Sequence, residues 1–309
     1  MESNSNDKIS KFRKSIRKNL VLYLLVIPVL VYFLVFKYIP MYGLQIAFKE
    51  FIATKGIGGS PWVGTEHFIR FFNSHYFWRL IQNTLGIGIY QLVVGFPIPI
   101  ILALLINEIR NKSHKSFIQT VTYAPHFLSV IVLVGMLFLF LSPTNGIVNQ
   151  VIILFGGEPV HFMTESKWFK SIYVFSGVWQ QMGWSSIIYL AALSAVDPQL
   201  HDAAKIDGAS RLQRIWYVNL PTILPTIIIL LILQSGDILS VGFEKVFLMQ
   251  NQLNMEASDV IATHVYRSGI LGAQYDYSAA IGLFESLTNF IVLLMVNYFA
   301  KRTSSTSLW

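Results

Sequence analysis

Long runs without a charged residue divide this sequence and limit what it can fold into more than any other feature. Five runs contain no Asp, Glu, Lys or Arg, and a sixth contains only Glu285: 20–36, 80–107, 116–157, 171–196, 215–236 and 277–300. A membrane-spanning helix needs about 20 mostly apolar residues, whereas the strands of a membrane barrel alternate in polarity over about 10 residues. The runs therefore predict an all-α, polytopic membrane protein.

We expect six membrane-spanning helices, near 20–40, 80–107, 117–141, 171–196, 220–241 and 277–300. The third run also includes a loop after its helix, because Ser142-Pro143-Thr144-Asn145-Gly146 is a turn cluster. Only 13% of the residues are charged, against about 25% in soluble domains. No small-residue cleavage site follows the first run, so we expect it to be retained as a span.

Basic residues are divided unevenly between the segments that separate these runs. If the N-terminus is cytoplasmic, the inward-facing segments hold 14 of the 23 Lys and Arg residues within 59 residues: 1–19, 108–116, 197–218 and 301–309. The outward-facing segments hold the other 9 within 107 residues. Basic residues gather on the cytoplasmic side of membrane proteins, so we expect both termini in the cytoplasm. The net charge of +7 then faces anionic lipid, and no nucleic-acid partner is expected.

Several kinds of site are missing from the sequence. It contains no Cys, so neither a disulfide nor a thiolate metal site can form. The dipeptide Gly-Lys does not occur, which excludes a phosphate-binding loop of the P-loop type. No two of the seven His residues stand at metal-ligand spacing, and neither Gly-x-Ser-x-Gly nor His-Glu-x-x-His occurs. We expect no catalytic residue, no metal site and no cofactor bound by this chain.

A polar segment, 197–221, separates the fourth and fifth runs. We expect it to form two short helical pieces hinged at Gly208. The second piece is amphipathic, because apolar residues recur at helical spacing: Leu212, Ile215, Trp216 and Leu220. A loop with its own apolar face either lies on the membrane surface or docks on a partner, and the pattern favours neither.

The same segment carries a longer motif. Asp202-Ala203-Ala204 is followed after three residues by Gly208, and after nine more by Val218-Asn219-Leu220-Pro221. This is similar to the signature loop of permease subunits in binding-protein-dependent ABC importers. There, Glu-Ala-Ala, Gly and Ile-x-Leu-Pro stand at the same intervals. The chain departs from that pattern with Asp at 202 and Val at 218.

The resemblance implies a type I ABC importer permease fold and a coupling helix that docks in a groove of a separate ATPase subunit. That subunit would bind ATP and Mg. The coupling residues in this chain would be Asp202, Ala203, Ala204, Gly208, Leu220 and Pro221. Their chemistry suits the role: glycine permits a sharp turn, the two alanines fit a narrow groove, and the carboxylate is available to a cationic partner.

The resemblance extends over about 20–302. Its further motifs, at 36–43, 60–64, 95–99 and 242–247, look like those of polysaccharide and oligosaccharide permeases, often grouped with the maltose-type sugar permeases. This implies a bacterial cytoplasmic membrane protein with a second, different permease subunit, two ATPase subunits or domains, and an external sugar-binding protein, often a lipoprotein. The domains would be a basic segment at 1–19, a permease domain at 20–302 and a tail at 303–309.

Polar residues within the spans indicate where an oligosaccharide would pass. Sugar sites combine flat aromatic faces with amide or carboxylate groups for the hydroxyls. The candidates lie on the helices on either side of the loop and on the last helix: Trp179, Gln180, Gln181, Trp184, Gln234, Asp237, Glu285 and Asn289. The alternative is that these side chains hold neighbouring helices together. Because no Lys or Arg lies in the fifth or sixth span to neutralise Asp237 and Glu285, the sequence favours a neutral oligosaccharide, and a sugar with uronate residues stays open as the alternative.

Other functions stay open on the sequence. An ABC permease for amino acids or peptides has the same loop. A stand-alone channel or secondary carrier would leave the loop unexplained, and no internal repeat favours a carrier. A membrane enzyme would need a catalytic constellation that the sequence lacks.

Overall fold

The computed structural model describes residues 18–304 and 306–309. Most of the predicted basic segment 1–19, and residue 305 of the tail, lie outside the described residues. Within the described part, helices are the only extended regular elements, and Lys49 and Trp62 form one isolated antiparallel bridge. This confirms the prediction of an all-α fold.

Within residues 18–304, four helical segments are long and apolar enough to cross a membrane: Leu20–Phe48, Phe77–Asn107, Arg211–Ser235 and Tyr275–Thr303. They correspond to the first, second, fifth and sixth predicted spans. The first joins α2 (Leu20–Phe33), η1 (Leu34–Tyr38), α3 (Ile39–Met41) and η2 (Tyr42–Phe48). The second joins α6 (Phe77–Tyr90), η3 (Gln91–Gly95) and α7 (Pro97–Asn107). The others are α13 (Arg211–Arg214) with η5 (Ile215–Asn219) and α14 (Leu220–Ser235), and α18 (Tyr275–Thr303).

The third predicted span is bent, not one helix. Its first arm is α8 (Lys112–Tyr123) with η4 (Ala124–Phe127), its second arm is α9 (Val130–Phe140), and the two meet at 99°. Leu128 is extended, and Ser129 caps the new helix by accepting a hydrogen bond from the Val132 backbone N–H. If both arms form one span, this bent pair is a fifth membrane crossing.

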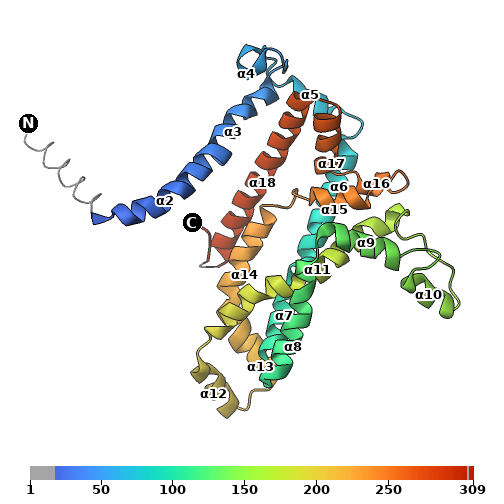
Figure 1. Cartoon of the computed structure of the whole chain (residues 1–309). Coiled ribbons are helices and arrows are strands. Elements are labelled where there is room, and N and C mark those ends of the chain that lie inside the picture. The colour runs from blue at the N-terminus through green and yellow to red at the C-terminus, as the bar shows by residue number, and fades with distance from the viewer. Residues whose placement is uncertain (1–17, 305) are drawn as a thin grey trace, which may run out of the picture.

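The fourth predicted span is α11 (Ser166–Ser194), a single helix of 29 residues. It is long enough to cross a membrane, but its polar side chains make it less apolar than the other spans. Helix α11 runs through the middle of the molecule, beside α7, α8 and α14 (Figure 1). Short helices complete the fold: α4 (Gly56–Gly59), α5 (Glu66–Phe72), α10 (Ile147–Leu154), α12 (Pro198–Ile206), α15 (Phe243–Met249), α16 (Met255–Ser258), α17 (Ile261–Val265) and η6 (Tyr266–Leu271).

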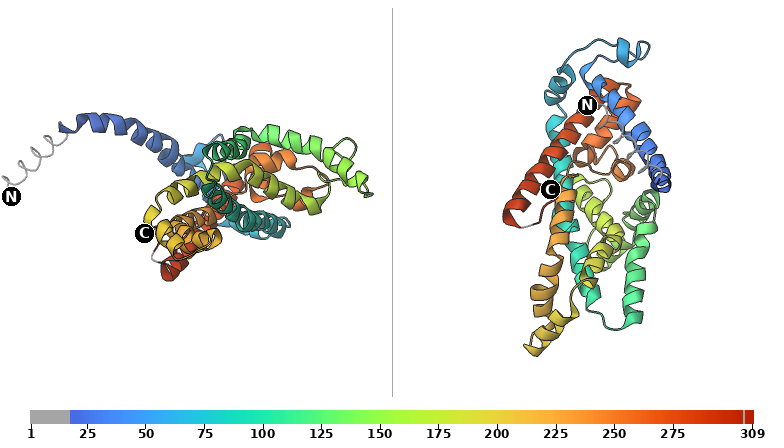
Figure 2. Two further views of the ribbon diagram at one scale, coloured as in Figure 1. Left: turned by 90° about the horizontal axis from the view of Figure 1, so that it is seen from below. Right: turned by 90° about the vertical axis from the view of Figure 1, so that its left-hand side faces the viewer.

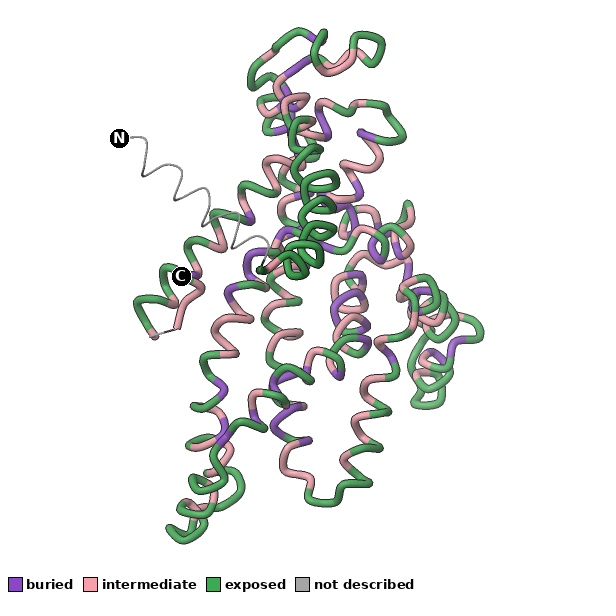
Figure 3. The backbone as a smooth tube through the Cα atoms, turned by 60° about the vertical axis from the view of Figure 1, so that its left-hand side comes forward, coloured by how far each residue is buried: buried purple, intermediate pink, exposed green. Residues whose placement is uncertain are grey.

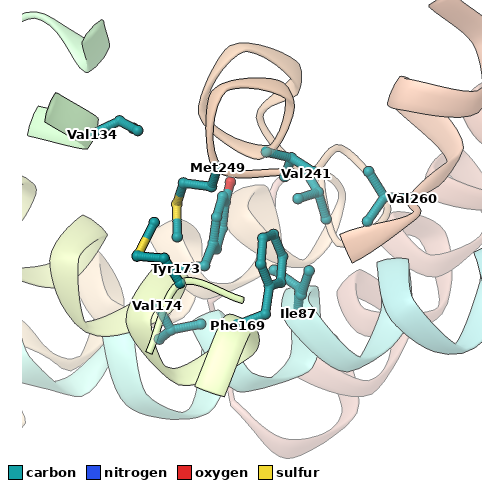
Figure 4. Packing of buried hydrophobic residues seen from close by; sticks show 10 residues of the cluster. Ile87, Val134, Phe169, Tyr173, Val174, Val241, Met249 and Val260 are labelled. Carbon is teal, nitrogen blue, oxygen red and sulfur yellow. The ribbon is translucent and has the colours of Figure 1, made fainter. Parts of the chain in front are cut away.

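Three clusters of buried apolar side chains hold the helices together. The largest joins α6, α9, α11 and α15 and includes Ile87, Val134, Phe169, Tyr173 and Met249 (Figure 4). A second joins α7, the end of α11 and α14, and a third joins α5, α6, α17 and α18. Helix α11 therefore contributes to two of the three cores.

Helix α2 stands apart from these cores. It projects away from the other helices, and the views in Figure 2 agree on this. None of its residues is buried, so its whole length is exposed in Figure 3. A helix that is apolar all round and unburied within its own chain needs lipid or another protein around it.

At the end of the molecule opposite α12, a buried carboxylate joins α6 and η6. The Asp259 side chain is only 1% exposed and pairs with Arg79 of α6, at 2.7 Å, and with Arg267 of η6. The two guanidinium groups compensate the Asp259 carboxylate for the water that it loses in this buried site. The contact ties the second span to the segment that precedes the last one.

A glycine permits the close approach of α11 to α8. A Cβ added at Gly183 would lie 2.0 Å from the Thr122 carbonyl oxygen, a distance at which the backbones have to separate. Gly135 on α9 has no atom within 4 Å of the same added atom. Small residues at such crossings let membrane helices pack backbone to backbone.

We therefore predict that Gly183→Ala destabilises the purified protein by about 1–3 kcal/mol, the usual cost of overpacking. Thermal unfolding in detergent measures this as a lower melting temperature. The matched variant Gly135→Ala should melt at or slightly above the wild-type temperature. Equal melting temperatures for Gly183→Ala and Gly135→Ala would contradict the close packing of α8 and α11.

Candidate substrate cavity and coupling loop

A cavity of about 620 Å³ opens between α11, the junction of η3 and α7, α14 and the start of α15. Its volume lies in the range of small-molecule sites, about 300–1,000 Å³. Apolar residues such as Phe96, Val178 and Leu230 form part of the wall. The polar lining residues are Gln91, Tyr173, Gln180, Gln181, Ser185, Tyr189, Gln234, Asp237 and Lys245. The cavity thus combines apolar and aromatic surface with groups that hydrogen-bond hydroxyls.

Gln180 is fixed in the cavity wall by the bend of the third predicted span. It is buried, and its Nε2 donates to the Leu128 carbonyl oxygen at 2.8 Å. Leu128 lies between the two arms, outside either helix. The bend leaves the Leu128 carbonyl without a helical hydrogen bond, and the Gln180 amide donates one to it. The Gln180 side chain therefore joins two segments and also lines the cavity.

Gln181 contacts a small aromatic group formed between α11 and η4. Its Oε1 lies 2.8 Å from His126 Nδ1, and His126 stacks on Trp184 with ring centroids 4.3 Å apart. Gln181 lines the cavity, whereas Trp184, which is 47% exposed, does not. Trp179 is also exposed and lies outside the cavity lining.

The candidates at the end of α14, just after it, and on α18 also differ in whether they line the cavity. Gln234 and Asp237 line the cavity, and Glu285 does not. Asn289 is buried and links two segments, since its Oδ1 accepts from the Leu239 N–H at 3.0 Å and its Nδ2 donates to Ser240 Oγ at 2.9 Å. Four of the eight predicted residues therefore share one cavity. That they contact a substrate stays a prediction.

The most informative residues that sequence reasoning missed are Gln91 and Lys245. Gln91 lies in the middle of the second charge-free run, and an amide there is a signal of a polar surface. Lys245 lies in the motif at 242–247, outside the predicted spans, so its entry into the cavity depends on the fold of α15.

The predicted coupling loop forms α12, a turn and α13. Gly208 has a φ of +79°, a left-handed conformation that favours glycine, and it is the hinge that the sequence predicts. Ser210 and Gln213 then form a capping box that starts α13. The second piece differs from the expectation of a separate short helix, because it continues through η5 into α14. Leu220 and Pro221 begin that helix.

The surface of this loop is exposed and partly apolar. Asp202, Ala203 and Gly208 are exposed, and Ala204 is half-buried. Ile206 is 86% exposed, and Leu212 and Trp216 are also exposed. Of the predicted apolar face, Ile215 and Leu220 instead pack on the core around α7 and α11. The loop therefore presents α12 and the start of α13 to its surroundings (Figure 1).

Asp202 is already paired within α12. Lys205 Nζ donates to Asp202 Oδ1 at 2.7 Å, and this hydrogen bond lowers the pKa of the Asp202 carboxyl. An aspartate is ionised at neutral pH in any case, and the lowered pKa extends the ionised state to more acidic pH. A cationic partner would share this carboxylate with Lys205 or replace it.

The loop is also tied to the end of the second span. Arg214 lies 4.0 Å from Glu108, and Asn219 Nδ2 lies 3.5 Å from another oxygen of the same carboxylate. Asn219 is fully buried. A displacement of α13 would therefore be passed to α7, which lines the cavity at Pro99.

Comparison with known proteins agrees with this geometry. A sequence model of the family described as binding-protein-dependent transport system inner membrane component matches residues 95–305, more than half of the chain. The chain belongs to this family. Its relatives are transport permease proteins, which confirms the prediction of a transporter subunit rather than an enzyme.

Individual relatives match over nearly the whole chain. The polygalacturonan/rhamnogalacturonan transport system permease protein YteP of Bacillus subtilis is 44% identical over 94% of this chain and 93% of its own length. The lactose transport system permease protein LacF of Rhizobium radiobacter is 25% identical over 75% of this chain and 76% of its own. A solved bacterial alginate ABC transporter, in complex with an alginate pentasaccharide-bound periplasmic protein, superimposes with a TM-score of 0.88. It is 40% identical and covers 96% of this chain and 99% of the other.

The cavity lining generates a prediction that separates solute contact from helix packing. The Gln234 side chain faces the cavity, so Gln234→Ala should lower transport at limiting solute several-fold and leave the melting temperature of the complex unchanged. Asn289→Ala, which removes two contacts between segments, should instead lower the melting temperature. Uptake into proteoliposomes and thermal unfolding measure the two effects. A lower melting temperature for Gln234→Ala, together with weaker transport and an unchanged melting temperature for Asn289→Ala, would contradict the placement of the cavity.

Proposed function

We propose that this chain is one of two different permease subunits of an ABC importer that carries oligosaccharides into the cell. Separate ATPase subunits bind ATP and Mg and dock on α12, and an external sugar-binding protein delivers the substrate. In the transport cycle, closure of the ATPase pair moves α12, and the cavity changes from facing the cytoplasm to facing outward. Both termini lie in the cytoplasm.

The observation that carries this proposal is the exposed α12 at the signature spacing. Its apolar residue Ile206 and its small residues Ala203 and Ala204 lie beside the left-handed hinge Gly208. Water is a poor environment for such a surface, and a groove in another protein is a good one. The link from Arg214 to Glu108 supports a route by which movement of the docked loop reaches the cavity.

The substrate class is supported by the cavity and by the relatives. Three glutamine side chains on α11 and α14 and two tyrosine rings suit the hydroxyls and flat faces of sugar rings. The relatives named above transport polygalacturonan or rhamnogalacturonan, lactose and alginate. These names span neutral and acidic carbohydrates, so they support an oligosaccharide without deciding its charge. None of these names favours an amino acid or a peptide.

A second permease subunit is supported by the exposed apolar surface of the first span. Helix α2 has no buried residue, and its side chains are apolar on all sides. Substrate pathways in such importers are enclosed by two subunits, and one chain with a cavity at its surface provides one wall.

We predict that Gly208→Val uncouples ATP hydrolysis from uptake. A β-branched residue at a φ of +79° is strained, so the turn between α12 and α13 should change shape. Uptake into proteoliposomes should fall at least about tenfold, while ATP hydrolysis continues or the ATPase dissociates during purification.

The matched control is Gly156→Val. Gly156 has a φ of +82° and, like Gly208, has no atom within 4 Å of an added Cβ, but it lies in the loop after α10. This variant should keep uptake and ATPase coupled. Normal coupled transport in Gly208→Val would show that α12 is not the element that couples ATP hydrolysis to uptake. The charge-reversing pair Asp202→Lys with Ala203→Glu should uncouple in the same way.

The orientation is testable because the chain contains no Cys. Single cysteines at the exposed positions Ser113 and Thr144 lie in predicted inward and outward segments. A membrane-impermeant maleimide should label Thr144→Cys in intact spheroplasts, and Ser113→Cys only after permeabilisation. The opposite pattern would reverse the topology.

A further inference from the structure

Lys245 is the cationic residue that the fold brings into the cavity. It is only 8% exposed, and it lines the same cavity as Gln180, Gln234 and Asp237. Its Nζ donates to the Tyr173 carbonyl oxygen at 2.7 Å and lies 4.6 Å from the centroid of the Tyr173 ring. Lysine is almost never this buried unless an anion accompanies it.

No such anion is supplied by residues 18–304 or 306–309. Among the described residues, no carboxylate oxygen lies within 4.0 Å of Lys245 Nζ. The ammonium group has three donors, and the described contacts use one of them. A buried cation with unused donors at the edge of a cavity is suited to an anionic group that enters the cavity.

The surroundings of the ammonium group are arranged to leave it accessible. A Cβ added at Gly177, which also lines the cavity, would lie 3.2 Å from Lys245 Nζ. The absence of a side chain at this position therefore gives the ammonium group its room. Tyr173, which contacts the ammonium group, is itself buried in the core of α6, α9, α11 and α15.

Asp237 provides the opposite charge in the same cavity. It is exposed and lies more than 4.0 Å from the Lys245 ammonium, so the two do not form an ion pair. A carboxylate accepts hydrogen bonds from sugar hydroxyls, whereas an ammonium group binds a sugar carboxylate. The two charges together suit a ligand that carries both groups.

We propose that Lys245 binds the carboxylate of the passing sugar and that the substrate is an oligosaccharide containing uronate residues. This inference rests on the proposed function and deepens it. It also replaces the neutral oligosaccharide favoured by the sequence, since that reasoning took only the spans into account. The Lys245 ammonium compensates the loss of water around the carboxylate, and the glutamines and Asp237 bind the hydroxyls.

The test compares an oligogalacturonide with the neutral galactose oligomer obtained by reducing its carboxyl groups. Binding of each to the complete transporter in nanodiscs is measured by saturation-transfer NMR or calorimetry, without the external protein, so that the preference of that protein does not enter. Lys245→Gln keeps a donor for the Tyr173 carbonyl but removes the charge. It should weaken binding of the oligogalacturonide at least about tenfold, as expected for a lost charge-assisted hydrogen bond, and leave the neutral oligomer unchanged.

Two further variants complete the test. Lys245→Arg should restore binding of the oligogalacturonide to within a few-fold of wild type. Lys170→Met removes a half-buried lysine on α11 that does not line the cavity, and it should change neither affinity. Equal weakening of both oligomers by Lys245→Gln, no weakening of either, or wild-type binding that does not favour the oligogalacturonide would each overturn the proposal.

ATP-driven uptake separates this inference from the proposed function. Proteoliposomes with the external protein should import the oligogalacturonide, and Lys245→Gln should reduce that import. Import of the oligogalacturonide that is insensitive to Lys245→Gln would overturn the uronate inference alone. Absence of ATP-driven import of any carbohydrate by the wild-type complex would remove the proposed function itself.

Discussion

Hydrogen bonds to α11 hold two neighbouring segments of the chain against it. Lipid offers no hydrogen bond, so polar groups on a membrane-spanning helix have to face protein or a wet cavity. The Gln180 side chain of α11 donates to the Leu128 carbonyl, and Lys245 of α15 donates to the Tyr173 carbonyl of α11. These two contacts hold the bent third segment and α15 against α11. The cavity lies beside these contacts, so the same groups that assemble the helices shape it.

The sequence predicts the spans well because charge-free runs follow directly from the cost of placing charge in lipid. The bend of the third span was not predicted, because the charge-free run continues through it, although the first arm carries Gln and Thr side chains and the second arm is apolar throughout. Ser129, a good N-cap residue after Pro125, was the available signal for a new helix. The hinge at Gly208 was predicted because a turn between short helices needs a left-handed residue, and the structure has one there.

The site was predicted only in part, for a different physical reason. Helical spacing places Gln180 and Gln181 near one another. It does not show whether a given face of the helix lines a cavity, faces lipid or contacts a partner. Trp184 shares their part of α11, yet it stacks on His126 outside the lining. Lys245 reaches the cavity from a short helix that follows the fifth span, a tertiary contact with α11 over 72 residues of sequence. Local pattern carries no information about such a contact.

The exposed first span makes the protein responsive to its lipid. Leu20–Phe48 has 29 residues, which at about 1.5 Å per residue gives a length of about 43 Å. The hydrocarbon core of a bilayer is only about 30 Å thick. The first part of this span, α2, has no buried residue, whereas η2 at its other end packs against α18, so the span can tilt from that anchored end to fit the bilayer. Bilayer thickness therefore contributes to the angle at which α2 leaves the body of the protein.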